Sequence, residues 1–153
     1  MRIAEFLSPQ AIVSDLSARS KLEVLKELSA SLARGNSLLR SERLVEVFQE
    51  REKLGSTGIG EGVAIPHGKL PDVGKLMASF GVSRGGVDFE AIDGKKTHLF
   101  FALIAPVNSA GIHLKALARI SRLFKNARFR EAILAVATSE EIYQLIAEED
   151  AKA

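Results

Sequence analysis

Apolar residues recur at three- and four-residue intervals in the first third of the chain, as on one face of an amphipathic helix. Ser20 and Glu23 have the spacing of a capping box, and the apolar residues that follow them end at Gly35: Leu22, Val24, Leu25, Leu28 and Leu32. A second apolar series follows Ser41, a candidate N-cap, and stops at Gly55: Leu44, Val45, Val47 and Phe48. The pattern predicts two helices before any strand.

The middle of the chain changes to the pattern of strands and turns. Residues 55–70, GSTGIGEGVAIPHGKL, contain five glycines and then a short β-branched run, which predicts a loop that leads into a strand. Residues 76–83, LMASFGVS, predict another strand, with turns at Gly85-Gly86 and at Asp93-Gly94. The run from Leu99 to Ile104 is apolar on both faces, which favours a central, covered strand.

Two further helices are expected in the last third of the chain. One covers residues 110–125, and Thr138 and Glu141 have capping-box spacing ahead of the other. The order helix, helix, strands, helix, helix predicts an α/β (α+β) fold in which a mixed sheet is sandwiched between helices. No internal repeat or low-complexity linker divides the sequence, so we expect residues 1–153 to form a single domain.

Composition excludes several classes of protein. The 153 residues are 46% hydrophobic and 26% charged with no cysteine, which excludes a disordered chain, a disulfide scaffold and thiolate chemistry. A net charge of +2 gives no indication of a nucleic-acid partner. The apolar stretch from Leu99 to Val107 is far shorter than the roughly 20 residues of a membrane helix, and Glu5 interrupts the start, where a signal peptide is apolar. We therefore expect a cytoplasmic protein without membrane insertion.

The glycine-rich segment fits neither common nucleotide-binding motif. Five residues separate Gly62 from Gly68-Lys69 where a P-loop has four, and Leu70 replaces the Ser or Thr that holds magnesium. The dinucleotide fingerprint fails because Val63 stands where its third glycine belongs. Binding of a nucleotide through either motif is not expected.

His67 has the most evident chemistry in this segment. Pro66 fixes its own φ and favours an extended Ile65, so a stiff strand end presents the imidazole, and Gly68 adds no side-chain bulk beside it. A neutral imidazole is a nucleophile that can attack phosphorus without a metal or a cofactor. The alternative is a polar residue that only fills the mouth of a pocket, and His67 alone does not decide between them.

Two more residues are candidates for the same site. His113 falls on the inward arc of the long helix and in its first turn, where the helix dipole favours an anion and a neutral imidazole. Arg51 precedes the glycine segment and can match phosphate oxygens bidentately. As alternatives to a role in the site, His113 would be a buried histidine at the start of the helix, and Arg51 would be a solvated residue on a helix surface. His98, which opens the apolar strand, is expected only to bind backbone.

The same residues resemble a known family. REKLGSTGIGEGVAIPHGKL at 51–70 and GIHLKALARIS at 111–121 are similar to segments of the enzyme IIA proteins of the fructose-mannitol class in the bacterial phosphotransferase system. The resemblance extends to DGKKTHLFFALIAP at 93–106 and TSEEIYQLIAEED at 138–150, so it spans nearly the whole chain. It is greatest for the nitrogen-regulatory branch of this class.

This resemblance implies a mixed five-stranded sheet between helices and a phosphocarrier that needs no cofactor. His67 matches the phosphorylated histidine, His113 the second active-site histidine and Arg51 the arginine beside the pocket. The implied donor is a small histidine phosphocarrier protein, supplied from phosphoenolpyruvate through enzyme I. Sugar-branch members pass the phosphoryl group to a IIB component, whereas nitrogen-regulatory members control nitrogen and potassium metabolism through target proteins. Both branches and the oligomeric state stay open.

Other residues are expected to complete or surround the site. Backbone N–H groups of Ser56, Thr57, Gly58 and Gly60 are candidates to bind phosphate oxygens. Ile59 and Ile112 are candidates for an apolar rim, to which Val63 and Ile65 would contribute if they did not close the core. A basic stripe on the long helix, of Lys115, Arg119, Arg122 and Lys125, is expected to point away from the site and either to be solvated or to attract an acidic partner.

Two other functional classes remain as alternatives. A metal-dependent hydrolase would use the three histidines as ligands, but the chain has no His-Glu-x-x-His pair and no acidic residue at ligand spacing from His67, so no metal is expected. A non-catalytic regulatory binding domain would keep the fold without phosphoryl transfer. The presence of His67 argues against such a loss of phosphoryl transfer.

Overall fold

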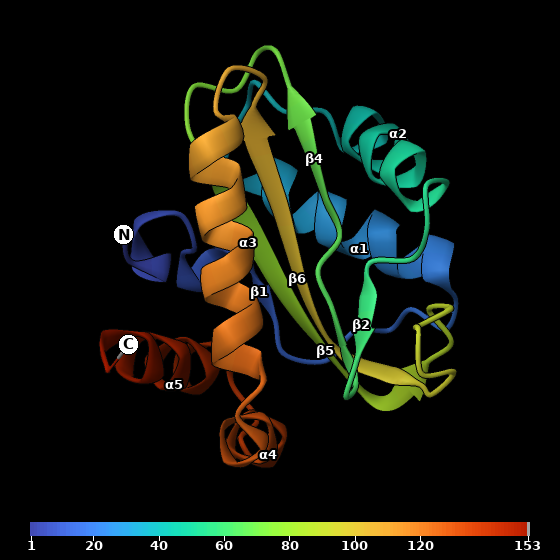
Figure 1. Cartoon of the computed structure of the whole chain (residues 1–153), viewed down its shortest axis with the longest axis vertical. Helices are drawn as coiled ribbons and strands as arrows, with labels where there is room; N and C mark the ends of the chain where they lie inside the picture. The colour runs from blue at the N-terminus through green and yellow to red at the C-terminus, as the bar shows by residue number, and fades with distance from the viewer. Residues whose placement is uncertain (153) are drawn as a thin grey trace.

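A mixed sheet lies between two groups of helices in the computed structural model, which describes residues 1–152. α1 (Lys21–Arg34) and α2 (Ser41–Glu52) cover one face of the sheet (Figure 1). α3 (Ala110–Phe124), α4 (Ala127–Ala135) and α5 (Ser139–Ala151) pack on the other side. Short 3-10 turns at Ile3–Glu5 and Pro9–Ala11 precede the first strand. Among the described residues, no helix is both long enough and apolar enough to cross a bilayer.

The sheet contains six strands, of which two long ones form the centre. These are β1 (Ile12–Val13), β2 (Gly58–Gly60), β3 (Val63–Ala64), β4 (His67–Leu70), β5 (Met77–Val87) and β6 (Thr97–Pro106). β5 and β6 pair antiparallel, and β1 lies parallel to β5. β3 and β4 follow one another along the far edge of β6, both parallel to it, and β2 pairs antiparallel with β3. This confirms the expected fold class, with one strand more than the expected five.

The residues of β6 alternate between two hydrophobic cores. Phe101 and Leu103 face the core beneath α3, and Phe100 and Ile104 face the core beneath α1 and α2. All four are fully buried. β6 is therefore the central, covered strand that its run of apolar residues predicts.

Several local predictions are confirmed. The helix from Thr138 has its complete capping box with Glu141, and the Asp93-Gly94 turn is closed by a hydrogen bond from the Gly94 N–H to the Ala91 carbonyl. At Ser20 only half of the box forms: its hydroxyl accepts from the Glu23 N–H, while the Glu23 carboxylate accepts from the N–H of Arg19.

Three local predictions differ from the structure. Ser41 is the first helical residue and not the cap, because Arg40 occupies the N-cap position without a side-chain bond. Gly85-Gly86 does not end a strand: β5 continues through it, with Gly86 at φ +80° in an irregularity of the register with β6. The nine residues of α4 were not expected, because so short a helix carries little periodic signal; Asn126 caps it by accepting from the Phe129 N–H.

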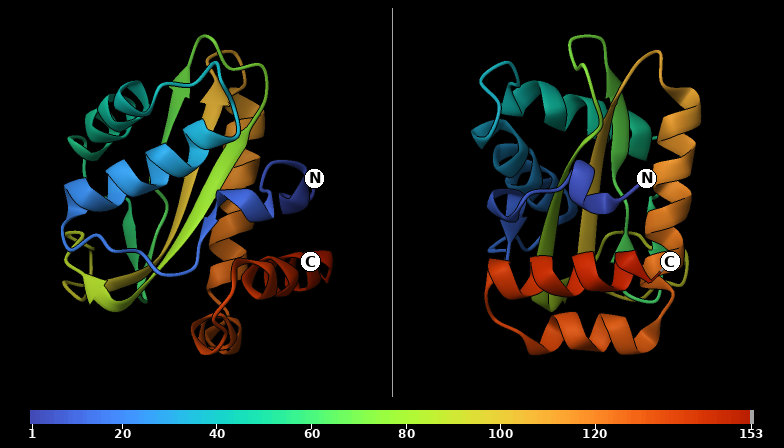
Figure 2. Two further views of the ribbon diagram at one scale, coloured as in Figure 1. Left: turned by 180° about the vertical axis from the view of Figure 1, so that it is seen from behind. Right: turned by 90° about the vertical axis from the view of Figure 1, so that its left-hand side faces the viewer.

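A buried carboxylate connects the two ends of the chain, which lie on the same side of the molecule (Figure 2). Asp150 in α5 is 2% exposed and accepts a 2.7 Å hydrogen bond from the Ile3 N–H. Its other oxygen binds the guanidinium of Arg119 in α3. Both oxygens of Asp150 are therefore paired, and the carboxylate holds the N-terminal turn, α3 and α5 together.

Replacing Asp150 by Ala should lower the free energy of unfolding by about 3 kcal/mol, because it leaves a partly buried guanidinium and a backbone N–H without their partner. Urea denaturation measures the loss. Glu148→Ala, on the same helix but exposed, is the matched control and should change the free energy of unfolding by less than about 0.5 kcal/mol. Equal effects in the two variants would contradict the assigned role of Asp150.

Candidate functional site

His67 is the first residue of β4, at the point where the edge of the sheet is interrupted. β3 pairs with β6 up to Ala64, and pairing resumes at His67 opposite Leu103. Pro66 lies in the gap and has no N–H to give, although its carbonyl accepts from the Leu103 N–H at 2.9 Å. The imidazole of His67 therefore lies at the edge of the sheet, at the start of β4.

Two hydrogen bonds fix which nitrogen of His67 carries the proton. Nδ1 lies 2.8 Å from the carbonyl oxygen of Ile65, which can only accept, so Nδ1 is the protonated nitrogen. The Nε–H of Arg51 donates to Nε2 at 3.2 Å, which requires a lone pair there. Arg51 is itself oriented by donation from Nη1 to the Gly55 carbonyl at 3.0 Å. Nε2 is therefore the nucleophilic atom of this ring.

His113 meets His67 edge-on. The ring centroids are 5.4 Å apart, with an angle of 84° between the rings. His113 is 5% exposed, and its Nε2 has no hydrogen-bond partner among residues 1–152. The inward direction expected from helical periodicity is confirmed, and Nε2 of His113 is a buried polar atom without a partner among these residues.

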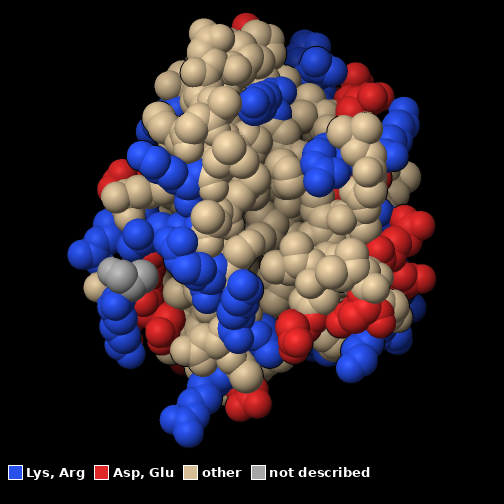
Figure 3. Space-filling model, in the orientation of Figure 1, with Lys and Arg blue, Asp and Glu red and all other residues tan. Residues whose placement is uncertain are grey.

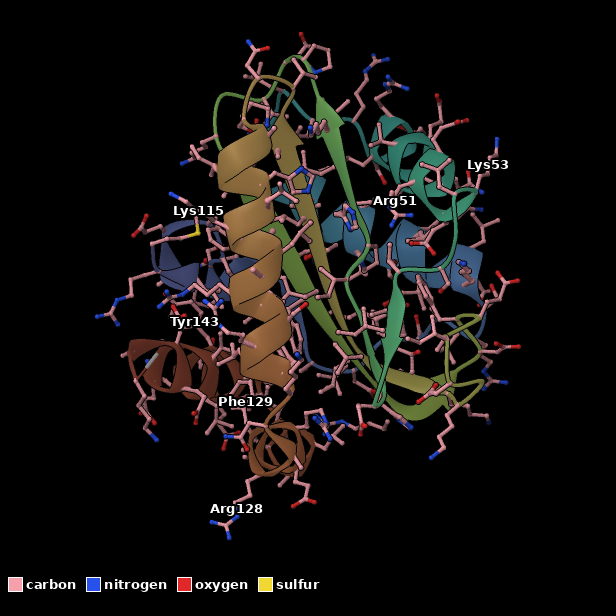
Figure 4. All side chains as sticks on the ribbon, in the orientation of Figure 1. Arg51, Lys53, Lys115, Arg128, Phe129 and Tyr143 are labelled. Atoms are coloured by element: carbon pink, nitrogen blue, oxygen red, sulfur yellow. The ribbon has the colours of Figure 1, made fainter. Side chains whose placement is uncertain are left out.

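An open cavity of about 640 Å³ surrounds the two rings, between α2, β4 and the start of α3. Figure 4 shows Arg51 directed from α2 toward β4, and Figure 3 shows a largely uncharged surface between α3 and α2. Leu54 and Leu114 are 82% and 68% exposed at its rim. The remaining lining residues are Val47, Glu50, Gly68, Lys69, Ala110 and Leu117.

Burial and neighbouring charge keep both imidazoles neutral at pH 7. Burial lowers the pKa of His67 below its usual range and Arg51 lowers it further, against the opposing effects of the Ile65 carbonyl and Glu52. Burial lowers the pKa of His113 to about 4, with contributions from His67 and Lys69. A neutral His67 retains the lone pair that nucleophilic attack needs.

The structure does not bring the expected phosphate-binding loop into the cavity. The Thr57 N–H donates to Glu52 and the Gly58 N–H donates to Ser56 Oγ, so these groups are already used. Ser56 Oγ donates in turn to the Phe89 carbonyl. Gly60 lies against Asp93, away from the lining residues. The N–H groups of Thr57 and Gly58 are therefore unavailable to a ligand in the cavity.

The other expected neighbours also lie elsewhere. Val63 and Ile65 are core residues, and neither Ile59 nor Ile112 lines the cavity, whose apolar rim comes from Leu54 and Leu114. His98 binds the Ser83 carbonyl at 3.0 Å through Nδ1, as expected of a histidine that binds backbone.

The basic stripe of α3 points away from the cavity, as expected. Lys115 lies on the side of α3 opposite Arg51 (Figure 4), and none of the four stripe residues lines the cavity. Arg119 is bound to Asp150, while Lys115, Arg122 and Lys125 are exposed. The stripe takes no part in the site around His67.

Lys69 was not among the expected site residues, and Gly68, expected only to add no bulk beside His67, also permits a close contact with α2. Lys69 lies two residues after His67, so the alternation of a strand places both on the same face of β4, and this spacing was a usable signal. A Cβ on Gly68 would lie 2.3 Å from Cγ1 of Val47 in α2, so only glycine permits this approach of the helix that carries Arg51. Nothing in the sequence identifies that contact.

Within the part of the chain that the structure describes, no three His, Cys, Asp or Glu side chains form a group that could hold a metal ion. The three histidines are divided: His67 and His113 meet in the cavity, and His98 is bonded to backbone on the far portion of β6.

Comparison with known proteins identifies a family. Residues 5–149 match the model of the family described as "Phosphoenolpyruvate-dependent sugar phosphotransferase system, EIIA 2". A nitrogen regulatory protein of Bradyrhizobium diazoefficiens is 41% identical over 96% of this chain and 95% of its own length. The fructose-specific EIIABC component of Bacillus subtilis is 34% identical over 98% of this chain, which corresponds to 24% of that longer protein.

A solved structure is also similar throughout. The crystal structure of the nitrogen regulatory protein IIA-Ntr from Neisseria meningitidis superimposes with a TM-score of 0.88 and 38% identity, covering 94% of this chain and 98% of that one. The similarity therefore includes the whole arrangement of sheet and helices and is not confined to the segments around His67 and His113.

The lowered pKa of His113 predicts a pH-dependent loss of stability. Between about pH 6.5 and pH 4 the unfolded chain binds a proton at this position that the folded chain does not, so the free energy of unfolding falls as the pH decreases through this range. The contribution is on the order of 3 kcal/mol, from about 1.4 kcal/mol per pKa unit.

NMR titration of the ring protons and urea denaturation at several pH values check this. His113→Gln, which cannot titrate, should show a flatter dependence of the free energy of unfolding on pH. A His113 midpoint near 6.5 would contradict the buried, neutral state.

Proposed function

The chain belongs to the EIIA 2 family of the phosphoenolpyruvate-dependent sugar phosphotransferase system, and we propose that it is a phosphocarrier that accepts a phosphoryl group on Nε2 of His67. The observation that carries this is the pair of hydrogen bonds on that ring, which hold the proton on Nδ1 and direct the lone pair of Nε2 toward Arg51 at an open cavity. His113, the other neutral imidazole of the cavity, has no such pair of hydrogen bonds to fix its tautomer.

In the proposed step, the lone pair of Nε2 forms a new N–P bond while the N–P bond to a donor imidazole breaks and its electron pair returns to the donor ring. The Nδ1 proton stays on His67, bonded to the Ile65 carbonyl. The phosphorylated ring therefore carries a positive charge next to the negative phosphoryl group. A group attached in this way leaves readily, as a carrier requires.

Arg51 and His113 act on the phosphoryl oxygens. Arg51 donates to Nε2 in the unphosphorylated protein, and when phosphorus takes that position its guanidinium is close enough to pair with the oxygens. His113, neutral and with an unpartnered Nε2, supplies a hydrogen bond to these oxygens when Nε2 carries its proton. Lys69 and the first turn of α3, which begins at Ala110, add positive potential at the same cavity.

The cavity rim suits a protein donor. Leu54 and Leu114 expose large apolar side chains beside His67, and burying them against a partner would remove water from the reacting atoms. The donor we propose is the small histidine phosphocarrier protein of the phosphotransferase system, supplied by enzyme I.

Two destinations for the phosphoryl group have support among the relatives. The nitrogen regulatory proteins match this chain over nearly their full lengths at 41% and 38% identity, which favours a role in which the phosphorylation state of His67 regulates target proteins of nitrogen and potassium metabolism. The fructose-specific relative at 34% identity supports transfer to a IIB component as the second candidate.

Incubation with phosphoenolpyruvate, enzyme I and the small phosphocarrier protein should place one acid-labile, alkali-stable phosphate on each chain. His67→Ala should abolish the label, since it removes the attacking atom. His113→Ala should slow labelling by roughly 10- to 100-fold without preventing it, because its role is to stabilise charge. His98→Gln, at the histidine outside the cavity, is the control and should label at the wild-type rate.

Label that persists in His67→Ala would contradict the proposal. Adding a IIB component of the fructose or mannitol type to the labelled protein distinguishes the two destinations. The IIB component should accept the phosphate within seconds if the sugar-branch role is correct. The phosphate should stay on His67 if the regulatory role is correct.

A further inference from the structure

Glu52 and Lys21 form an ion pair behind the cavity. Through the turn that follows α2, this pair is linked to the hydrogen-bond partners of both nitrogens of His67. We infer that Glu52 and Lys21 are positioning residues, which hold the turn after α2 so that the His67 ring keeps a single tautomer and orientation. The inference rests on the proposed function for its effect on rate, but its structural content concerns the unphosphorylated protein and can be tested there.

Glu52 is a carboxylate taken out of water at the end of α2. Its side chain is 6% exposed, and Lys21 at the start of α1 binds its Oε1 at 2.9 Å. Lys21 also binds Glu90 at 3.1 Å and lies 4.9 Å above the Phe89 ring. Burial opposes the charge of Lys21, but its hydrogen bonds to Glu52 and Glu90 outweigh this and raise its pKa. Lys21 therefore keeps its positive charge at neutral pH.

The carboxylate of Glu52 fastens the turn that follows it. The Thr57 N–H donates to Oε1 at 3.1 Å, and the Thr57 hydroxyl donates to Oε2 through a short hydrogen bond. Thr57 is 4% exposed. Because both oxygens of Glu52 bind Thr57 and one also binds Lys21, three hydrogen bonds to one carboxylate close the turn from residue 52 to residue 57.

Both ring nitrogens of His67 are partnered through this turn. The Thr57 carbonyl accepts from the Ile65 N–H at 3.0 Å, and the Ile65 carbonyl accepts from Nδ1. On the other side, Arg51 binds the Gly55 carbonyl inside the turn and Nε2 of the ring. Releasing the turn would therefore loosen the partner of Nδ1 and the partner of Nε2 together.

The consequence for phosphoryl transfer concerns the fraction of protein that is ready to react. Attack needs the lone pair on Nε2 and the proton on Nδ1. A ring with loosened partners shares its proton between the two nitrogens and turns away from the attack direction. Loss of the Glu52 charge should therefore reduce the rate of phosphorylation by roughly tenfold, as expected when a supporting hydrogen bond to a reacting group is removed.

The test uses the full chain in the absence of a donor. The ¹⁵N shifts of the His67 ring should show a single Nδ1–H tautomer in the wild type and a mixture of both tautomers in Glu52→Gln and in Lys21→Met. Lys21→Arg keeps the charge and should restore the wild-type tautomer. Glu46→Gln is the matched control, since this glutamate also lies on α2 but is 65% exposed and pairs with Arg43 at the surface.

The phosphorylation rate is measured on the same variants. A single Nδ1–H tautomer in folded Glu52→Gln and Lys21→Met overturns the inference, whether or not the wild type accepts phosphate. A tautomer mixture in both supports it even if no phosphate is accepted, in which case only the proposed function fails. If Glu52→Gln does not fold, Thr57→Val decides in the same way, because it removes one of the two bonds to Glu52 and keeps the residue volume.

Discussion

The site depends on one hydrogen bond, from Nδ1 of His67 to the carbonyl of Ile65 two residues earlier. Ile65 and Pro66 lie between β3 and β4, where Pro66 has no N–H to donate, while the register with β6 is the same on both sides of this gap. The bond leaves Nε2 as the only basic atom of the ring, and β6, buried on both faces, holds the strand end in place. A local irregularity in a rigid sheet thus defines the chemistry of one side chain.

The charges around this ring serve two purposes at once. Burial is the main cause of the lowered pKa values of His67 and His113; Arg51 lowers the first and Lys69 the second further, and the same charges favour a bound phosphoryl group. Where the two rings meet edge-on, Nε2 of His113 has no partner among residues 1–152, and in the proposed function a phosphoryl oxygen supplies one. A buried nitrogen without a hydrogen-bond partner costs free energy, and a bound group that pairs with it would remove that cost.

Local signals in the sequence predicted the elements better than their contacts. Capping at Thr138 and the apolar run of β6 identify a helix and a central strand, because each depends on neighbouring residues. That His67 and His113 meet depends on how β6 brings β4 beside α3, which spacing along the chain does not contain. The backbone N–H groups of the glycine loop were expected to be candidates for binding phosphate oxygens. In the structure, the Thr57 N–H donates to Glu52 and the Gly58 N–H donates to Ser56.

The central claim is that the bond to Ile65 makes Nε2 the reactive atom of His67, and the position of phosphorus on the imidazole tests it most directly. In the phosphorylated protein, ¹⁵N spectra of the His67 ring should show coupling to ³¹P at Nε2 and an attached proton at Nδ1, as the bond to Ile65 requires. Phosphorus on Nδ1 of His67, or on any other side chain, would contradict the role given to that bond and with it the proposed path of phosphoryl transfer.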